Sequence, residues 1–121
     1  MVAVLIDTCI LIDYLHNRPG AAEELALYAD PAISSISWIE VMVGASANTE
    51  IGTRNFLDRF VLVPLDEPIS DRAVLLRRRH RLKLPDAISW ASAQMTGRTF
   101  VTRDAKDFAK GDPGIRIPYK L

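Results

Sequence analysis

The segment VAVLIDTCILIDYL, residues 2–15, decides the fold. Its first five residues are all apolar and do not alternate with polar ones, which is typical of a strand covered on both faces in a parallel sheet. An apolar pattern with helical spacing resumes over residues 9–17. Between the two lies Asp7, and burying an unpaired carboxylate costs several kcal/mol. We therefore expect Asp7 to have a partner, which could be a helix terminus, a basic side chain or a metal ion.

The size and cysteine content place the chain among ordinary globular domains. A chain of 121 residues buries roughly two thirds of its unfolded surface, so we expect one domain over residues 1–121. The only cysteine is Cys9, and with two histidines it cannot supply a four-ligand zinc site. The first apolar run lacks a basic flank and is interrupted by Asp7, so it predicts neither a signal peptide nor a membrane span. We expect a cytoplasmic protein that does not contact a membrane.

Strand and helix patterns alternate along the rest of the chain. Further strands are expected at residues 32–36, 61–65, 98–102 and 115–117, and helices at residues 19–29, from 37, and at 49–60, 68–83 and 85–97. Pro19 suits a helix start, and Gly97 suits a position just beyond a helix end. Alternation of this kind predicts an α/β fold with a mostly parallel central sheet of four to five strands flanked by helices.

Acidic residues come directly after the predicted strands. Asp7 follows the first strand, Glu40 lies one helical turn beyond the second, and Asp104 follows the strand at 98–102. Ligands of such sheets sit beyond the carboxyl ends of the strands, so these three side chains should share one edge. Asp86 opens the helix at 85–97, and spacing alone does not fix its side of the sheet.

Each of these carboxylates has two interpretations. Taken singly they are helix caps: Ser37 and Glu40 form an S-x-x-E capping box, Asp86 lies in a first helical turn, and Asp7 and Asp104 can cap the segments that begin after them. Taken together, converging carboxylates repel one another and persist only with raised pKa values or with a cation between them. Mg²⁺ and Mn²⁺ suit such oxygen ligands and also bind phosphate oxygens.

One segment concentrates positive charge although the chain as a whole is neutral. Fifteen basic residues balance fifteen acidic ones, yet residues 72–83 hold no acid. The basic side chains of this segment are Arg72, Arg77, Arg78, Arg79, Arg81 and Lys83. Such a stripe is either a solvated helix face or a phosphate-binding surface, because electrostatic steering depends on local potential.

Three segments resemble the PIN-domain family, and specifically its VapC-type ribonuclease toxins of type II toxin–antitoxin pairs. These segments are LIDTCILIDYL (5–15), SWIEVMVG (37–44) and LPDAISWASAQMTGRTFVTRDAKDF (84–108). The resemblance runs from about Val4 to Ile117 and is strongest over residues 4–15 and 84–108. The third segment is the most specific, because an acid, a helix of small residues, a glycine, a strand and T-R-D-x-x-D-F occur in a fixed order. Residues 47–83 match poorly.

The resemblance implies a metal-dependent endoribonuclease that cleaves structured or looped RNA with metal-activated water. Its cofactor would be Mg²⁺ or Mn²⁺, bound by Asp7 and Asp86, with Glu40 and Asp104 acting directly or through water. The position matching Asp104 varies between Asp and Asn in the family. The implied catalytic carboxylates and supporting hydroxyls are Asp7, Glu40, Asp86 and Asp104, with Thr8 and Thr102.

The resemblance also implies partners, and two other functions compete with it. VapC-type proteins are usually homodimers and are inhibited by a cognate VapB-like antitoxin whose tail covers the acidic pocket. RNA contacts are expected from Arg77, Arg78, Arg81 and Arg103, although Arg103 could instead form a structural ion pair. The first alternative is a binding module or scaffold with the same fold, in which the carboxylates are caps. The second is a phosphatase or phospho-accepting regulator built on Asp7.

Overall fold

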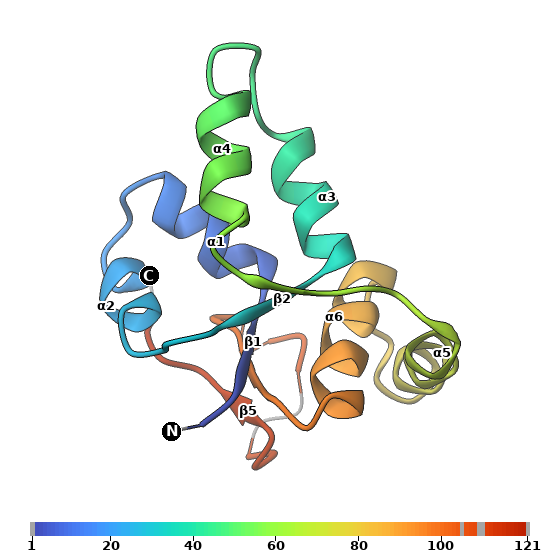
Figure 1. Cartoon of the computed structure of the whole chain (residues 1–121). Helices are drawn as coiled ribbons and strands as arrows, with labels where there is room; N and C mark the ends of the chain where they lie inside the picture. The colour runs from blue at the N-terminus through green and yellow to red at the C-terminus, as the bar shows by residue number, and fades with distance from the viewer. Residues whose placement is uncertain (1, 105, 109–110, 121) are drawn as a thin grey trace.

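The central sheet has five strands, and all of them are parallel (Figure 1). The computed structural model describes residues 2–104, 106–108 and 111–120. Its strands are β1 (Val4–Ile6), β2 (Ala32–Ser34), β3 (Val61–Val63), β4 (Thr99–Val101) and β5 (Ile115–Arg116), in the spatial order β3-β2-β1-β4-β5. The helices are α1 (Thr8–Leu15), α2 (Ala21–Leu25), α3 (Ser35–Val43), α4 (Glu50–Leu57), α5 (Glu67–His80) and α6 (Leu84–Met95). The predicted α/β class and parallel sheet are confirmed.

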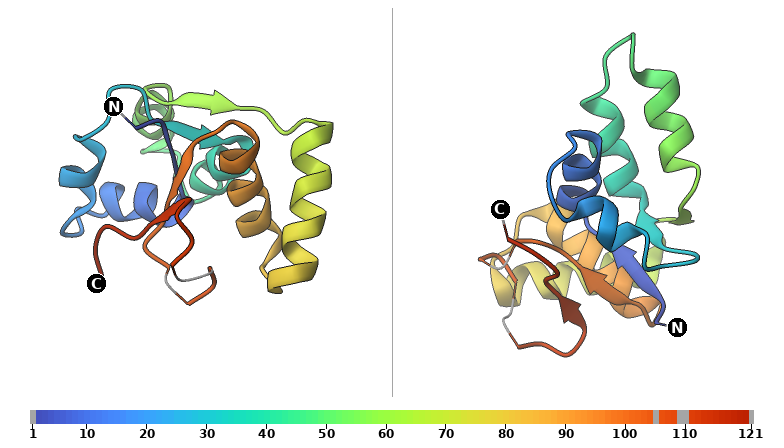
Figure 2. Two further views of the ribbon diagram at one scale, coloured as in Figure 1. Left: turned by 90° about the horizontal axis from the view of Figure 1, so that it is seen from below. Right: turned by 90° about the vertical axis from the view of Figure 1, so that its left-hand side faces the viewer.

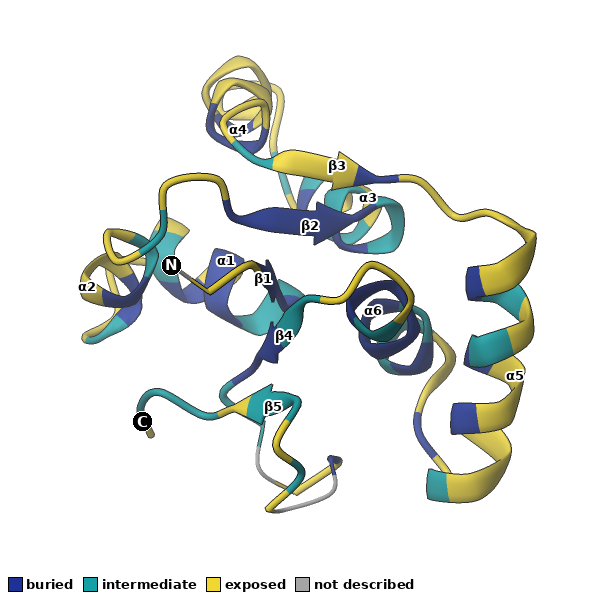
Figure 3. Cartoon of the chain, turned by 60° about the horizontal axis from the view of Figure 1, so that its bottom comes forward, coloured by how far each residue is buried: buried dark blue, intermediate teal, exposed yellow. Residues whose placement is uncertain are grey.

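The helices cover the sheet from both sides (Figure 2). Helices α5 and α6 contribute to a core with Leu5, Ala32 and Phe100, whereas α1 to α4 contribute to a second core with Val4 and Ile33. The strands β1, β2 and β4 are therefore buried on both faces (Figure 3), which explains why their sequences are apolar without alternation. The outer strand β3 is more exposed.

Strand β1 occupies the middle of the sheet and sets the register of the candidate site. It pairs with β2 on one side and with β4 on the other, where Ile6 lies opposite Val101. The ladder continues for one more bond, since the Asp7 backbone N–H donates to the Val101 carbonyl oxygen at 2.9 Å. The residues that directly follow β1 and β4 are therefore neighbours.

The start of α3 differs from the prediction and changes the role of Glu40. The helix begins at Ser35, because the side chain of Ser34 caps it by accepting from the Ser37 backbone N–H at 3.2 Å. The predicted helix start at Ser37, and with it the Ser37–Glu40 capping box, is wrong. Ser37 lies inside the helix, so Glu40 is released from capping and can serve another contact.

Two glycines mark helix boundaries. Gly20, with φ of 95°, caps the start of α2, so this helix begins at Ala21 and not at the predicted Pro19. Gly97, with φ of 66°, lies just beyond the end of α6, as its sequence position predicts.

Among the described residues, every helix is too short or too polar to cross a lipid bilayer.

Candidate active site

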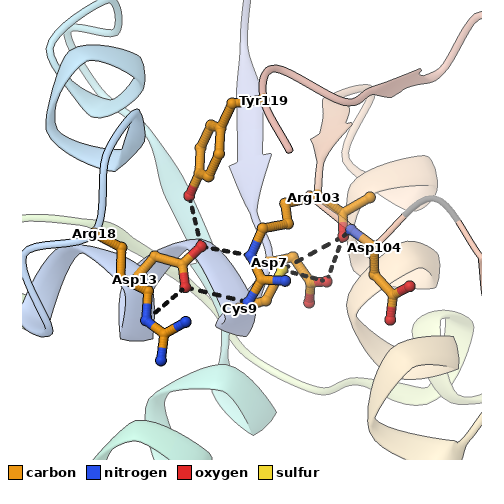
Figure 4. Close-up of polar contacts among 8 residues, drawn as sticks. Asp7, Cys9, Asp13, Arg18, Arg103, Asp104 and Tyr119 are labelled. Atoms are coloured by element: carbon orange, nitrogen blue, oxygen red, sulfur yellow. Dashed lines mark hydrogen bonds and ion pairs between the residues drawn. The ribbon is translucent and has the colours of Figure 1, made fainter. Parts of the chain in front are cut away.

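The carboxyl edge of the sheet holds Asp7 in a fixed orientation. Asp7 caps α1 by accepting from the Thr8 backbone N–H at Oδ1, over 2.8 Å. Its Oδ2 accepts from the Thr102 hydroxyl, also at 2.8 Å, and lies 3.5 Å from the Cys9 sulfur (Figure 4). The cap predicted for Asp7 is confirmed, yet it uses only part of the carboxylate. Each carboxylate oxygen has two lone pairs, so Asp7 keeps the capacity to bind a further group.

A layer of hydroxyl groups, which consists of Thr8, Ser34, Ser37 and Ser89, is connected to Glu40 through Thr8. The Thr8 hydroxyl lies 2.9 Å from Glu40 Oε1 and 2.8 Å from Ser37 Oγ. Because a carboxylate can only accept, Thr8 donates its single proton to Glu40. Ser37 in turn lies 3.1 Å from Ser34 Oγ and 3.3 Å from Ser89 Oγ. These hydroxyls link α1, α3 and α6, the helices that carry or follow the carboxylates.

Asp86 and the acidic residues near it form a cluster of like charges. Partial burial raises the pKa of Asp86 to about 6, and the negative charges of Asp7, Asp107, Asp104 and Glu40 contribute, in that order. Burial also raises the pKa of Asp7, with Glu40 adding to the effect. The other three predicted carboxylates, Asp7, Glu40 and Asp104, therefore lie within electrostatic reach of Asp86, which lies at the same edge of the sheet as Asp7.

Asp107 is a fifth acid of this cluster. A hydrogen bond with Asp104 is the main cause of the raised pKa of Asp107. Asp107 is the second acid of the T-R-D-x-x-D-F motif, and its residue type alone favours a turn or a helix start. The three-residue spacing within T-R-D-x-x-D was the available signal, since it keeps both acids close together in the sequence. Asp104 also accepts from the Lys106 backbone N–H at 3.2 Å, which is a local contact of the capping kind.

The carboxylates do not form a closed cage for a metal ion. Within residues 2–104, 106–108 and 111–120, no three histidine, cysteine, aspartate or glutamate side chains are arranged as a set that could hold one. Mg²⁺ commonly binds through one or two carboxylates and keeps several waters. The donors present are carboxylate oxygens, which match the chemistry of such an ion, and two of these carboxylates, Asp7 and Asp86, have raised pKa values.

The predicted RNA-binding arginines fall into two groups. Arg77, Arg78 and Arg81 are exposed, at the last turn of α5 and just beyond it. Arg103 instead pairs with the buried Asp13, its Nε lying 2.5 Å from Asp13 Oδ2. This is the structural ion pair that the sequence left open as an alternative. In the same basic segment, Arg72 donates to Gln94 at 2.6 Å.

Cys9 borders the site without the properties of a nucleophile. Burial and the charge of Asp7 raise the pKa of its thiol to about 12. The thiolate is the reactive form of cysteine, and it is scarce at neutral pH when the pKa is this high. Cys9 packs against the core of α1 to α4 instead.

A groove opens beside Glu40 between α1, α3 and α4. It encloses about 480 Å³. Its lining is mainly apolar and consists of Ile12, Leu15, His16, Glu40, Val41, Gly44, Ala45, Ser46, Thr49 and Thr53. The acidic cluster is therefore continuous with an apolar surface suited to a bulky group.

The hydroxyl layer was missed in the sequence although its spacing was visible there. Ser37 precedes Glu40 by three residues, and Ser89 lies three residues beyond Asp86. On a helix this spacing puts both side chains on one face. Each of the two helical carboxylates thus carries a hydroxyl one turn away.

The fold, the acidic edge and the motifs identify the class of protein. The family model for the PIN domain matches residues 4–112, and the chain belongs to the PIN-domain family. The resemblance drawn from the three sequence segments is thereby confirmed. No curated protein matches the sequence of this chain.

The chain is also similar to chains of several solved structures. A chain of a toxin–antitoxin complex from Klebsiella pneumoniae is 43% identical, with a TM-score of 0.92, and the match covers 98% of this chain and 100% of that one. A chain of VapBC2 from Rickettsia felis, bound to a DNA fragment from its promoter, is 21% identical over 95% and 96% of the two chains, with a TM-score of 0.77. A chain of DNA-bound VapBC from Salmonella typhimurium is 22% identical, with 96% of both chains covered and a TM-score of 0.76. The last two similarities concern the fold.

Proposed function

We propose that this protein is the toxin of a toxin–antitoxin pair and acts as a divalent-metal-dependent endoribonuclease. The observation that carries the proposal is the group of carboxylates gathered with the half-buried Asp86 at the acidic edge, where like charges repel one another. Four other carboxylates contribute to the raised pKa of Asp86. A cluster that only capped helices could use serine or asparagine and would avoid this repulsion.

The ligand set fits one or two Mg²⁺ or Mn²⁺ ions. Asp7 and Asp86 would bind the ion directly, while Glu40 and Asp104 would act directly or through water. A bound ion of this kind supplies a Lewis acid that lowers the pKa of a water molecule and offsets negative charge on a phosphate.

The side chains of the protein perform the remaining tasks. Thr102 and the Thr8 backbone amide hold both oxygens of Asp7 in one orientation. Thr8 donates to Oε1 of Glu40 and so orients this carboxylate, whose remaining lone pairs can accept from water. The hydroxyl layer fixes α1 against α3 and α6, and thereby fixes Asp7, Glu40 and Asp86 relative to one another.

The basic end of α5 is the proposed binding surface for the RNA backbone. Arg77, Arg78 and Arg81 are exposed, and only a short connection separates them from Asp86 at the start of α6 (Figure 3). Each phosphate contact of single-stranded RNA contributes about 0.7 to the salt dependence of binding. Changing all three arginines to glutamine should lower that slope by up to about 2.

An antitoxin and a second copy of the chain are the proposed protein partners. The 43% identity to a chain of a toxin–antitoxin complex supports the first. The groove beside Glu40 is the proposed place for an apolar antitoxin segment, because a segment bound there would also block the carboxylates. Val43 and Ile51, exposed on the projecting pair of helices α3 and α4 (Figure 1), offer apolar surface for a dimer contact.

Cleavage of a mixed small-RNA pool tests the proposal. The wild type is compared with Asp7→Asn, Asp86→Asn and, as a control, Asp71→Asn, which removes an exposed carboxylate on α5. We expect cleavage that requires Mn²⁺ or Mg²⁺ and is lost in the first two variants only. Absence of cleavage, together with a loss of stability in both site variants, would support the scaffold alternative. Metal-stimulated hydrolysis of a simple phosphate ester without RNA cleavage would support the phosphatase alternative.

A further inference from the structure

Asp13 is a buried carboxylate with three partners, and none of them belongs to the acidic cluster. It lies in α1, and its side chain is only 1% exposed. Arg103 donates to it twice, from Nε to Oδ2 at 2.5 Å and from Nη2 to Oδ1 at 3.1 Å. The Tyr119 hydroxyl donates to Oδ2 at 2.8 Å. Arg18 Nε lies farther away, 3.9 Å from Oδ1, and Figure 4 shows all four side chains.

The position of Arg103 connects this network to the candidate site. Arg103 lies between Thr102 and Asp104 in the segment just after β4. Thr102 donates to Asp7 Oδ2 and accepts from the Asp104 backbone N–H at 3.1 Å. Three successive residues are thus attached to α1 at two points, to Asp7 at its start and to Asp13 farther along it.

The carboxyl-terminal segment supplies a further contact to Asp13 through Tyr119. The ring of Tyr119 packs against Gly20, where an added Cβ would lie 2.7 Å from Tyr119 Cγ. This contact holds the ring in place, so the Tyr119 hydroxyl donates to Asp13 from a fixed position. A bidentate pair between arginine and a carboxylate is both directional and strong, so Asp13 and Arg103 are suited to fixing geometry.

We propose that Asp13 and Arg103 are positioning residues of the nuclease site. Their ion pair holds residues 102–104 so that Thr102 orients the Asp7 carboxylate and Asp104 stays at the acidic edge. This inference rests on the proposed function. It also assigns the guanidinium of Arg103, which is 30% exposed, to Asp13 and not to RNA.

The test is a graded series at position 103 with a matched control. Arg103→Lys keeps the charge and loses the paired donors, whereas Arg103→Gln loses both. Arg18→Gln is the control, because Arg18 is close to the same carboxylate but is 51% exposed and is not part of the segment after β4. Mn²⁺ affinity is measured by titration calorimetry, and RNA cleavage is followed by single-turnover kinetics at saturating Mn²⁺.

We expect Arg103→Gln to weaken Mn²⁺ binding by about tenfold and to slow cleavage by about 10- to 100-fold, as changes in groups that orient metal ligands do. Arg103→Lys should fall between this variant and the wild type, and Arg18→Gln should match the wild type. The RNA concentration at half-maximal rate should stay the same throughout. A merely structural contact would lower the melting temperature without this change in Mn²⁺ affinity.

Two results would overturn the inference. One is a folded Arg103→Gln protein with wild-type Mn²⁺ affinity and cleavage rate. The other is a rise in the half-saturating RNA concentration alone, which would assign Arg103 to a phosphate. If Arg103→Gln does not fold, the same criteria apply to Arg103→Lys, which keeps Asp13 paired. A wild type that binds Mn²⁺ but cuts no RNA would contradict the proposed function, while the Mn²⁺ affinities would still test the positioning role.

Discussion

Replacing Asp86 by asparagine should stabilise the metal-free protein. The pKa of Asp86 rises from 3.8 to about 6 in the folded state, and at about 1.4 kcal/mol per unit this sets an upper limit of about 3 kcal/mol. Asp86 is half-buried, so screening by solvent reduces the effect to about 1–1.5 kcal/mol. The melting temperature at pH 7.5 should therefore rise by about 4 °C in a buffer with a metal chelator.

The sign of this effect depends on pH in a defined way. A carboxyl group with a raised pKa in the folded state favours folding when protonated, and this advantage is lost as the pH rises from about 4 to about 6. Asparagine does not titrate. The wild type and Asp86→Asn should therefore be about equally stable near pH 4, and the variant should become the more stable protein above about pH 6.

Thermal unfolding followed by circular dichroism measures the difference, with Asp71→Asn as the control for removal of an exposed carboxylate. That control should change the stability by less than about 0.5 kcal/mol. With Mn²⁺ at about 100 times its dissociation constant, the wild type should gain about 2.7 kcal/mol and Asp86→Asn much less. Destabilisation of metal-free Asp86→Asn at pH 7.5 would refute the reasoning, because it would show that the carboxylate supports the fold.

Three further predictions concern contacts outside the acidic cluster. Arg116→Gln should cost about 1–2 kcal/mol at pH 7, because Arg116 Nε donates to the buried Glu24 at 2.7 Å. Arg116 lowers the pKa of Glu24, so the cost measured in urea titrations should shrink as the pH falls below about 4. Gly20→Ala should lower the melting temperature, since φ is 95° and the new Cβ would meet the Tyr119 ring; an unchanged melting temperature would contradict this. The Cys9 thiol, with its pKa raised to about 12, should react with iodoacetamide at pH 8 at least tenfold more slowly than in urea, and equal rates would be the contrary result.

The sequence predicted the layout of the fold well and some of its boundaries poorly. The apolar strands and their alternation with helices predicted the parallel sheet, because strands buried on both faces do not alternate apolar with polar residues. The boundary between β2 and α3 was misplaced because several serines lie close together there and each can cap a helix. Only the tertiary structure selects Ser34, whose side chain reaches the Ser37 backbone N–H. The start of α2 was misplaced because Pro19 suits a helix start, whereas Gly20 adopts a left-handed φ of 95° and the helix begins only at Ala21.

The parts of the candidate site that depend only on the sheet topology could be predicted from the sequence. Parallel strands bring their carboxyl ends to one edge, which placed Asp7 and Asp104 together. The side of the sheet on which Asp86 lies, and the link between Asp13 and Arg103, depend on contacts between segments some ninety residues apart. Side-chain pairs this distant leave no periodic signal in a single sequence, so the structure was needed to find them.

The central claim is that the acidic edge is a metal-dependent site for RNA hydrolysis by water. The most direct test determines the ends of the RNA fragments produced with Mn²⁺ and with a chelator. Attack by water leaves a linear phosphate monoester, and attack by the neighbouring 2′-hydroxyl gives a 2′,3′-cyclic phosphate. We predict fragments with linear phosphate ends, formed only with Mn²⁺ and absent with Asp7→Asn. Cyclic phosphate ends formed without metal, or fragments that persist with Asp7→Asn, would contradict the account.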